Sequence, residues 1–399
     1  MKKIMMLGGN HFQVSATKRA KELGYYVISV DYLPNNPAHV YADEYHNVST
    51  IDKVAILSLA KKLKVDGILS YASDVSASTA AYVSEKLGLP TNPYDAVYTL
   101  THKDAFRDFM RKERFLTPQG ATFTNYDELL SFFKDIRKTI IVKPIDSSGS
   151  KGCIKVVAEG DLLVAYEEAM RYSIAKVVIG EEFIEKEGYQ IDGDGFVIDG
   201  KIELFFVMDQ HNDVECNPHA PIGLSYPSIQ SEDIQEAAKE FIQMVFTKLG
   251  IQFGAFNFEY IVGTDKKIYL LEIGPRNGGN YIPDTILHAT GISMIDWSIK
   301  AAVGDLSHVE YSNQLLRPCT SYLVHALENG IFNRIECQEE IEKRIVKQTL
   351  FVKEGDYVER FRNGASTIGA MVLAFEDVYR MKEKMDNMND YIRVLVDSN

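Results

Sequence analysis

Two glutamates in the middle of the sequence have the spacing of a metal site. The runs 253–261 and 267–273 are rich in apolar, aromatic and β-branched residues, and a Gly-Thr-Asp turn separates them, which predicts a β-hairpin. Each predicted strand carries one acid, Glu259 or Glu272. A carboxylate in an apolar strand is costly to ionise unless a cation lies beside it, so the pair predicts a divalent-metal site. Mg²⁺ suits it, because Mg²⁺ takes one or two protein carboxylates and completes its shell with water and phosphate.

Two further stretches have the residue types of phosphate-binding groups. Arg276 lies four residues after Glu272 in a loop with Gly and Pro, and its guanidinium can bind a phosphate or carboxylate through two hydrogen bonds. Lys143 lies in the apolar run 140–144, which predicts a strand, and the small-residue loop 146–152 follows it. Such a loop can turn its backbone N–H groups onto anionic oxygens. It is not a Walker A motif, because the second glycine before Lys-Ser/Thr is missing.

The N-terminal part predicts a domain of alternating strands and helices. Apolar runs at 3–7, 26–30 and 67–71 predict strands, and the intervening segments predict helices, which indicates a parallel, doubly wound sheet over residues 1–98. This is an α/β, Rossmann-like organisation. The turn after the first strand, Gly8-Gly9-Asn10, lacks the third glycine of G-x-G-x-x-G, which argues against a dinucleotide site.

The amino-acid composition and the net charge argue against several classes of protein and partner. The chain has 399 residues, of which 46% are hydrophobic and 25% charged, as in ordinary globular proteins. A net charge of −13 argues against nucleic-acid and anionic-membrane partners. The four cysteines are far apart with no metal-ligand spacing, so we expect reduced thiols in a cytoplasmic protein. We find no signal peptide and no apolar run of membrane length.

The hairpin and its following loop resemble the metal-binding end of the ATP-grasp superfamily. The matching residues are E-Y-I on the first strand and L-L-E-I-G-P-R-N-G-G on the second. The usual family pattern is a Glu, a short hairpin and then Glu-x-Asn-x-Arg. Gly274 stands where the Asn ligand is expected, so the third ligand would be Asn277 or water. The glycine form resembles the carboxylate–amine ligase branch, which includes L-amino-acid ligases. The resemblance implies Mg²⁺ or Mn²⁺ with ATP.

The same resemblance assigns the nucleotide-binding residues. Lys103 and Lys143 would reach the phosphates of ATP. The loop after Lys143 would be a phosphate flap that includes Ser147, Ser148, Gly149, Ser150 and Gly152. The run VVIGEEFI would form the hinge under adenine, with contacts from Glu181, Glu182, Phe183 and Ile184. The glutamate expected at the ribose is replaced by Gly188, and the adjacent Glu187 would have to reach it.

The resemblance also implies a domain organisation. A pre-ATP-grasp domain would cover residues 1–98, with its turn at 9–13 and residues 73–74 facing a co-substrate. The ATP-grasp core would cover 99–316, with a mobile small lobe at about 117–182. A C-terminal α+β lobe, as in biotin-carboxylase-like enzymes, would cover 317–399. We further predict one helix over 101–114 and a long irregular loop over 208–228 beside the second substrate.

These expectations combine into a prediction of function. Such a protein would be an ATP-dependent ligase that joins a carboxylate to an amine through an acyl phosphate, releasing ADP and phosphate. Arg276 and Lys143 would act on the charge of the transferring phosphoryl group. Two alternatives stay open: a small-molecule kinase on the same scaffold, and a nucleotide-binding regulatory subunit without turnover. The partners would be small carboxylates and amines, with a homodimer also open. The sequence does not identify either substrate.

Overall fold

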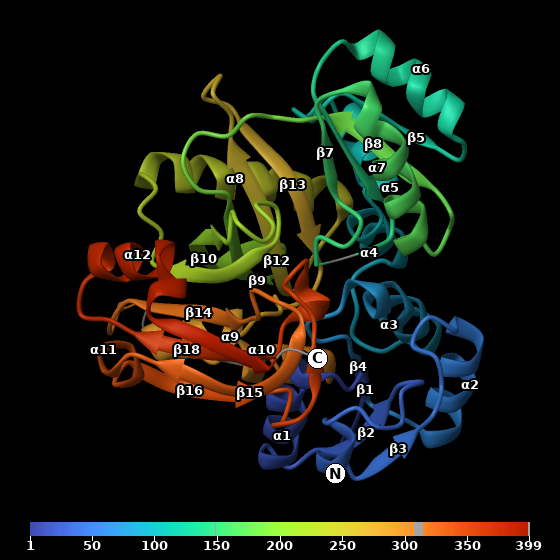
Figure 1. Ribbon diagram of the computed structural model, residues 1–399. Coiled ribbons are helices and arrows are strands. Elements are labelled where there is room, and N and C mark those ends of the chain that lie inside the picture. Colours follow the sequence, from blue (N-terminus) through green and yellow to red (C-terminus); the bar gives the residue numbers. More distant parts are fainter. Residues whose placement is uncertain (148, 307–313, 398–399) are drawn as a thin grey trace.

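The computed structural model describes residues 1–147, 149–306 and 314–397, and within them four β-sheets are flanked by helices (Figure 1). The N-terminal domain, the small lobe and the central sheet lie around a common junction in Figure 1. This mixed α/β architecture confirms the predicted fold class. No helix among the described residues is both long and apolar enough to cross a membrane.

The N-terminal domain contains a four-stranded parallel sheet in the order β3-β2-β1-β4. Its central strands are buried after their first residues, because helices cover both faces. The Rossmann-like prediction for this part is confirmed. Its strands are β1 (Lys3–Leu7), β2 (Tyr26–Val30), β3 (Glu44–His46) and β4 (Gly67–Leu69), and its helices are η1 (His11–Gln13), α1 (Val14–Glu22), η2 (His39–Tyr41), α2 (Lys53–Leu63) and α3 (Asp74–Leu87).

Two helices connect this domain to the rest of the chain, and the second is the helix that was predicted over 101–114. They are α4 (Tyr94–Thr101) and α5 (Lys103–Lys112). His102 breaks the helix because its backbone is extended, with φ −120° and ψ 115°. Its ring stacks on Tyr98 at 3.8 Å between ring centroids. The break places Lys103 at the first turn of α5, facing the predicted phosphate loop.

The small lobe contains an antiparallel sheet in the order β5-β8-β6-β7 with two helices packed against it. In Figure 1 it stands apart at the upper right. Its apolar residues form a core of their own, to which both helices contribute. The elements are β5 (Gly120–Phe123), α6 (Tyr126–Ile136), β6 (Ile140–Pro144), β7 (Ile154–Val156), α7 (Glu159–Tyr172) and β8 (Val178–Glu182).

An eight-stranded antiparallel sheet forms the centre, in the order β13-β12-β9-β10-β11-β14-β18-β16. Alternate residues of its strands face opposite sides. Val197 and Val207 pack under α8, whereas Phe196 and Phe206 pack under α9 and α10. The elements up to residue 302 are β9 (Ile191–Ile198), β10 (Lys201–Asn212), β11 (Pro221–Tyr226), α8 (Glu232–Leu249), β12 (Gly254–Val262), β13 (Ile268–Gly274), α9 (Ile282–Thr290) and α10 (Met294–Ala302).

The prediction of an irregular loop over 208–228 is wrong for most of its length. Strand β10 continues to Asn212, and β11 pairs back with it, so that only residues 213–220 and 227–228 of this stretch are irregular. The residues from Asp209 to Asn212 are all polar, so the sequence pattern did not predict a strand there. Asp209 and His211 are nevertheless buried, because Ser228, Ser225 and Asp386 provide hydrogen-bond partners for them.

The C-terminal segment continues the central sheet. β14, β18 and β16 extend it, while β17-β15-β19 form a small separate sheet. The central sheet continues across the predicted domain boundary at 316/317. That boundary stays a prediction. The elements are β14 (Cys319–Val324), β15 (Gly330–Cys337), α11 (Glu339–Glu342), β16 (Ile345–Leu350), β17 (Tyr357–Val358), η3 (Gly364–Ser366), β18 (Gly369–Ala374), α12 (Val378–Asp386), η4 (Met388–Asp390) and β19 (Ile392–Asp397).

A buried ion pair ties the small lobe to the central sheet. The Arg107 guanidinium on α5 donates to both carboxylate oxygens of Glu181 on β8, at 2.9 and 3.4 Å. It also donates to the backbone carbonyls of Leu270 and Leu271 on β13, at 3.2 and 3.0 Å. The Lys143 ammonium forms a further ion pair with Glu181. Burial alone would raise the pKa of Glu181, but Arg107 and Lys143 outweigh it and lower the pKa to about 2.

Replacement Glu181→Gln tests this cluster through its pH dependence. Since the pKa of Glu181 is lower in the folded than in the unfolded chain, its ionised form stabilises the fold above about pH 4.5, and this stability is lost as the pH falls toward 2. We expect Glu181→Gln to lower the free energy of unfolding by roughly 3 kcal/mol at pH 7. Urea denaturation of both proteins between pH 7 and 3 should show the difference shrinking below pH 4.5. A difference that does not change with pH would contradict this account.

Candidate active site

The two glutamates of the predicted metal site lie directly opposite each other. Glu259 on β12 pairs with Glu272 on β13 in the antiparallel register, so the predicted hairpin is confirmed. The Lys103 ammonium lies 3.1 Å from a carboxylate oxygen of Glu272. Burial would raise the pKa of Glu272, but Lys103 and Arg276 outweigh it and lower the pKa. Glu259 receives a hydrogen bond of 2.9 Å from the Gln190 amide, and burial together with Glu272 raises its pKa to about 7.

This pair of acids fits a divalent cation. The raised pKa of Glu259 shows that the neighbouring cations do not fully compensate two buried carboxylates. Within the described residues, no group of three or more His, Cys, Asp or Glu side chains is arranged to hold a metal ion on its own. Two carboxylates with water and phosphate oxygens are the ligand set that Mg²⁺ takes at nucleotide sites. The residues therefore fit Mg²⁺ bound together with a nucleotide.

Two aspartates on β9 belong to the same cluster and were missed in the sequence. Asp192 lies opposite Glu259 in the sheet, and burial and the charge of Glu259 raise its pKa. Asp194 is fully buried and accepts hydrogen bonds from the Gly278 N–H at 2.8 Å and the Asn257 amide at 3.1 Å. Burial raises the pKa of Asp194 to about 6. The pattern Ile-Asp-Gly-Asp-Gly, with two acids in an apolar strand, was the signal that could have revealed them.

Arg276 joins the cluster through a partner from the N-terminal domain. Its guanidinium forms an ion pair with Asp74, the first residue of α3, and donates to the Asn277 carbonyl at 3.2 Å. This pair explains Gly274. A Cβ at position 274 would lie 2.6 Å from a carboxylate oxygen of Asp74 and 2.9 Å from the Arg276 Cζ. The space in which the family pattern places Asn is thus occupied by the ion pair.

Asn277, predicted as a third metal ligand, has both polar atoms of its side chain engaged elsewhere. Its Oδ1 accepts a hydrogen bond of 2.5 Å from Ser298, and its Nδ2 donates to Asp194 at 3.3 Å. The side chain is almost fully buried. In this arrangement Asn277 holds the loop after β13 against β9 and α10. Water and phosphate oxygens remain to complete the metal shell.

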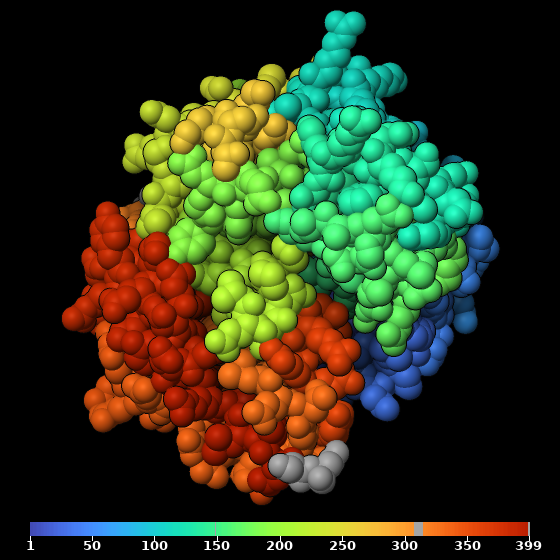
Figure 2. All heavy atoms as spheres, turned by 45° about the horizontal axis from the view of Figure 1, so that its top comes forward, coloured from blue at the N-terminus to red at the C-terminus, as the bar shows by residue number. Residues whose placement is uncertain are grey.

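The predicted phosphate loop lies between three parts of the chain. The Lys103 ammonium donates to the Ser147 carbonyl at 2.8 Å. Gly149, Ser150 and Gly152 have φ values of 71°, 58° and 70°, which turn the backbone sharply. The Ser150 hydroxyl donates to the His219 carbonyl at 3.0 Å, and the Gly364 N–H contacts the Gly149 carbonyl at 3.4 Å. Figure 2 shows the small lobe against these two segments. Ser148 lies outside the described residues.

The side chains of the predicted adenine hinge have other partners. The Glu181 carboxylate is bound by Arg107 and Lys143, and Glu182 pairs with Lys138 at 2.5 Å. The Phe183 N–H donates to the Thr139 carbonyl at 2.9 Å. If this segment binds adenine, we therefore expect the contacts to come from its other backbone groups, including those of Ile184.

Cys153 and Glu187 precede and follow the hinge in the sequence. Glu187, the predicted ribose ligand, forms an ion pair with Lys266 at the exposed tip of the hairpin. The ribose contact therefore stays a prediction. The Cys153 thiol lies close enough to Lys143 and Lys103 for their charges to lower its pKa, but burial outweighs them and raises the pKa. A protonated, packed thiol agrees with the absence of any nucleophile motif around it.

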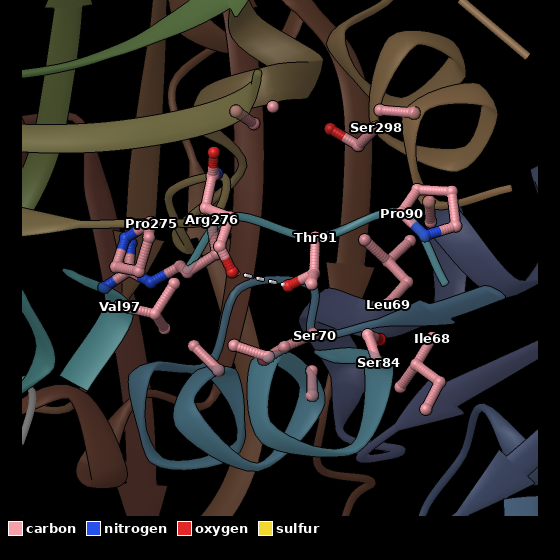
Figure 3. A pocket seen from close by; sticks show the side chains of 18 of the residues that line it. Ile68, Leu69, Ser70, Ser84, Pro90, Thr91, Val97, Pro275, Arg276 and Ser298 are labelled. Carbon is pink, nitrogen blue, oxygen red and sulfur yellow. Dashed lines mark hydrogen bonds between the residues drawn. The ribbon is translucent and has the colours of Figure 1, made fainter. Parts of the chain in front are cut away.

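Two cavities lie beneath the N-terminal domain, one on each side of the Asp74–Arg276 pair. A cavity of about 190 Å³ is lined by Asp74, Lys103 and Glu272 together with residues of α2 and α3. A smaller cavity of about 100 Å³ is lined by Arg276 and Ser298 and by the other side of α3. Figure 3 shows this second cavity, with Pro275 and Arg276 at one end and Ile68 and Pro90 at the other.

Comparison with known proteins agrees with this geometry. Residues 101–280 match the family model of the ATP-grasp domain. The formate-dependent phosphoribosylglycinamide formyltransferase of Sulfurovum sp. (strain NBC37-1) is 28% identical over 284 residues, 69% of this chain and 70% of that protein. The carbamoyl phosphate synthase large chain of Vibrio parahaemolyticus is 24% identical over 335 residues, 79% of this chain but only 30% of that protein.

The whole chain also shares its fold with solved structures. The crystal structure of the L-amino acid ligase from Bacillus licheniformis superposes with a TM-score of 0.82 at 17% sequence identity, covering 100% of this chain and 99% of that one. The parallel N-terminal sheet, the small lobe and the acid-bearing hairpin are therefore parts of one known architecture. Residues 101–280 of this chain thus form an ATP-grasp domain.

Proposed function

We propose that this protein is an ATP-dependent carboxylate–amine ligase that forms an amide bond through an acyl phosphate. The observation that carries the proposal is the convergence of Glu259 and Glu272 with the cations Lys103, Lys143 and Arg276 in one buried site. The related formyltransferase and carbamoyl phosphate synthase support it. The first name describes a formate-dependent formyl transfer, and the second describes synthesis of carbamoyl phosphate, which is an acyl phosphate.

The arrangement supplies what phosphoryl transfer from ATP requires. A substrate carboxylate oxygen attacks the γ-phosphorus, the bond to ADP breaks, and an acyl phosphate forms. An amine then attacks the acyl carbon, phosphate leaves with its electron pair, and the nitrogen loses a proton. Glu259 and Glu272 would hold Mg²⁺, which would supply positive charge to the phosphate oxygens. Lys103 and Lys143 hold phosphate oxygens, and Arg276 stabilises the charge on the transferring group. The loop 147–152 excludes water from the acyl phosphate.

Gly274 does not argue for a subunit without turnover. The ion pair of Asp74 and Arg276 fills the space of the missing Asn side chain, so the departure from the family pattern accompanies an added contact, not a lost one.

We also retain a cytoplasmic location, supported by four free cysteines. A homodimer through residues 317–399 is supported only by exposed apolar side chains there, such as Leu350 and Tyr357. Light scattering of the purified protein tests it.

The assay that tests the function measures products. The protein is incubated with Mg-ATP and pools of carboxylates and amines, and ADP, free phosphate and new amides are quantified by chromatography and mass spectrometry. The ligase predicts ADP and phosphate in equal amounts with one amide. ADP without free phosphate identifies a kinase instead. AMP with pyrophosphate excludes the acyl-phosphate route, and ATP binding without any turnover identifies a regulatory subunit.

Replacement Glu272→Gln tests the metal-binding role. The amide keeps the shape of the side chain but removes the charge that would bind Mg²⁺ and pair with Lys103. We expect kcat to fall about a hundredfold or more, corresponding to roughly 3 kcal/mol of lost transition-state stabilisation. Asp265→Asn, at the exposed turn of the same hairpin, is the matched control and should retain activity. Equal activity of the two variants would contradict the assignment.

Replacement Gly274→Ala tests the space around the Asp74–Arg276 pair. The added methyl group would lie within 3 Å of both partners and displace them, so we expect kcat/KM to fall about tenfold or more. Gly279→Ala in the same loop is the control, because nothing lies within 4 Å of a Cβ there. Steady-state kinetics of ADP release compare the two. An active Gly274→Ala enzyme would show that the pair tolerates movement.

A further inference from the structure

A third cavity, of about 600 Å³, lies between the loop 213–220 and the C-terminal segment. It shares no described lining residue with the two cavities on either side of the Asp74–Arg276 pair. Its walls come from that loop, the turn after β14, the end of α12, η4 and β19, and none of them is assigned to ATP or Mg²⁺. The volume falls within the roughly 300–1,000 Å³ of small-molecule sites, so the cavity can enclose most of a small ligand.

The buried polar residues of this cavity are held by the protein itself. The Asp213 carboxylate accepts hydrogen bonds from the His325 ring at 3.1 Å and from the Asn389 amide at 2.7 Å. The bond from His325, with that from Asn389, keeps the pKa of Asp213 below its usual range. These contacts join three separate segments around the cavity, so its shape is fixed before any ligand binds.

Three acidic side chains of the cavity have no such partner. Glu215 comes from the loop 213–220, Glu328 from the turn after β14 and Asp390 from η4, and all three are exposed. Among the described residues, no Lys, Arg or His nitrogen lies within 4.0 Å of their carboxylates. Arg393 is the only Lys or Arg among the described lining residues. A concave surface with an excess of one charge attracts the opposite charge, so this cavity favours a cation.

Apolar side chains supply the rest of the wall. Met385 and Met388 are buried beneath the cavity surface, and methionine adapts its shape to different apolar groups. Val214 and Leu327 are large apolar side chains that line the cavity and remain exposed to solvent. A ligand that covers them gains free energy from removing apolar surface from water. The wall therefore suits a cation that also carries an apolar group.

The loop 213–220 connects this cavity to the predicted phosphate flap. The Ser150 hydroxyl of the flap donates to the His219 carbonyl at 3.0 Å. In the same loop, the Asn217 amide donates to the Arg362 carbonyl at 2.6 Å. Figure 2 shows this loop between the small lobe and the C-terminal segment. A ligand that restrains the loop from the side of the cavity thus also restrains a contact of the flap.

Helix α12 connects the cavity to the strand that follows the predicted adenine hinge. Asp386, which lines the cavity at the end of α12, accepts hydrogen bonds from the Tyr189 hydroxyl at 2.7 and 2.6 Å and from the His211 ring at 2.9 Å. Tyr189 lies just before β9, which carries Asp192 and Asp194. The cavity therefore has a second, independent connection to the nucleotide site.

We propose that this cavity is a regulatory site for a small organic cation that joins one ammonium group to an apolar body, and that its occupant tightens the binding of ATP. The ammonium group binds among Glu215, Glu328 and Asp390, and the apolar body packs on the methionines. Because the occupant restrains two walls that contact the flap and β9, less ordering is left for ATP binding. The inference goes beyond the proposed ligase function, since it requires ATP binding but no turnover.

Binding is tested by isothermal titration calorimetry of the full-length protein with benzylamine, phenethylamine and tryptamine. At least one of them should bind with one-to-one stoichiometry, because it combines the charge and the apolar group that the cavity selects. Its alcohol analogue, its carboxylate analogue and ethylamine should each bind at least about tenfold more weakly. Absence of binding by all three amines, or equal binding of the alcohol, would overturn the proposal.

The regulatory role is tested by titrating a non-hydrolysable ATP analogue with Mg²⁺ in the presence and absence of the saturating amine. The Kd of the analogue should fall about fivefold or more, and the Kd of the amine should fall by the same factor when the analogue is bound, because coupling between two sites is reciprocal. An unchanged or higher Kd of the analogue would overturn the regulatory role.

Variants then locate the cation. The double replacement Glu215→Gln with Glu328→Gln should raise the Kd of the amine about fivefold or more and leave the Kd of the ATP analogue alone unchanged. Glu354→Gln with Glu359→Gln is the matched control, because it removes two exposed charges of the same segment that do not line the cavity. Equal weakening by both double variants would show that the amine responds only to net charge and would overturn the site.

The outcomes separate this site from the catalytic one. An amide of the bound amine, formed with release of ADP, would make the amine a substrate and overturn a separate regulatory site. Failure of every carboxylate and amine pool to give turnover would contradict the ligase function, whereas the calorimetric tests of the cavity would still hold.

Discussion

Charge balance in one buried cluster is the constraint on which the site depends. Acidic side chains outnumber basic ones there by two if all are ionised, and the pKa values of Asp192, Asp194 and Glu259 are raised, as expected where compensation is incomplete. One divalent cation would neutralise this excess. The acids are Asp74, Glu181, Asp192, Asp194, Glu259 and Glu272, and the bases are Lys103, Arg107, Lys143 and Arg276.

This cluster also determines how the parts of the chain are held together. Arg107 links the helix α5 to the small lobe through Glu181 and to the central sheet through the carbonyls of β13. Asp74 links the N-terminal domain to Arg276. Because a buried charge that loses its partner costs several kcal/mol, each of these contacts resists separation of the parts it joins. The groups that would bind the nucleotide are therefore the same groups that position the lobes.

Apolar packing fixes the N-terminal domain in this position. Strand β1 and helix α1 share one hydrophobic cluster with Ile295 and Ile299 of α10, and Arg19 binds Asp296 through two hydrogen bonds of 2.7 Å. The C-terminal segment contacts the same domain from another side, where Phe351 stacks on His11 at 4.2 Å. The N-terminal domain is thus a wall of the active site, which is why its helix α3 can line both cavities.

The sequence by itself determined the hairpin with Glu259 and Glu272, the parallel N-terminal sheet and the strand that carries Lys143, because periodicity and turn residues are local properties of the chain. The partners of these residues depended on tertiary structure. Asp74 meets Arg276 across 202 residues, and Arg107 meets Glu181 across 74. The strand at 208–212 was missed because its polar residues are buried only through hydrogen bonds to distant segments. Local patterns reveal which groups are costly to bury, whereas only the folded chain decides which distant groups compensate them.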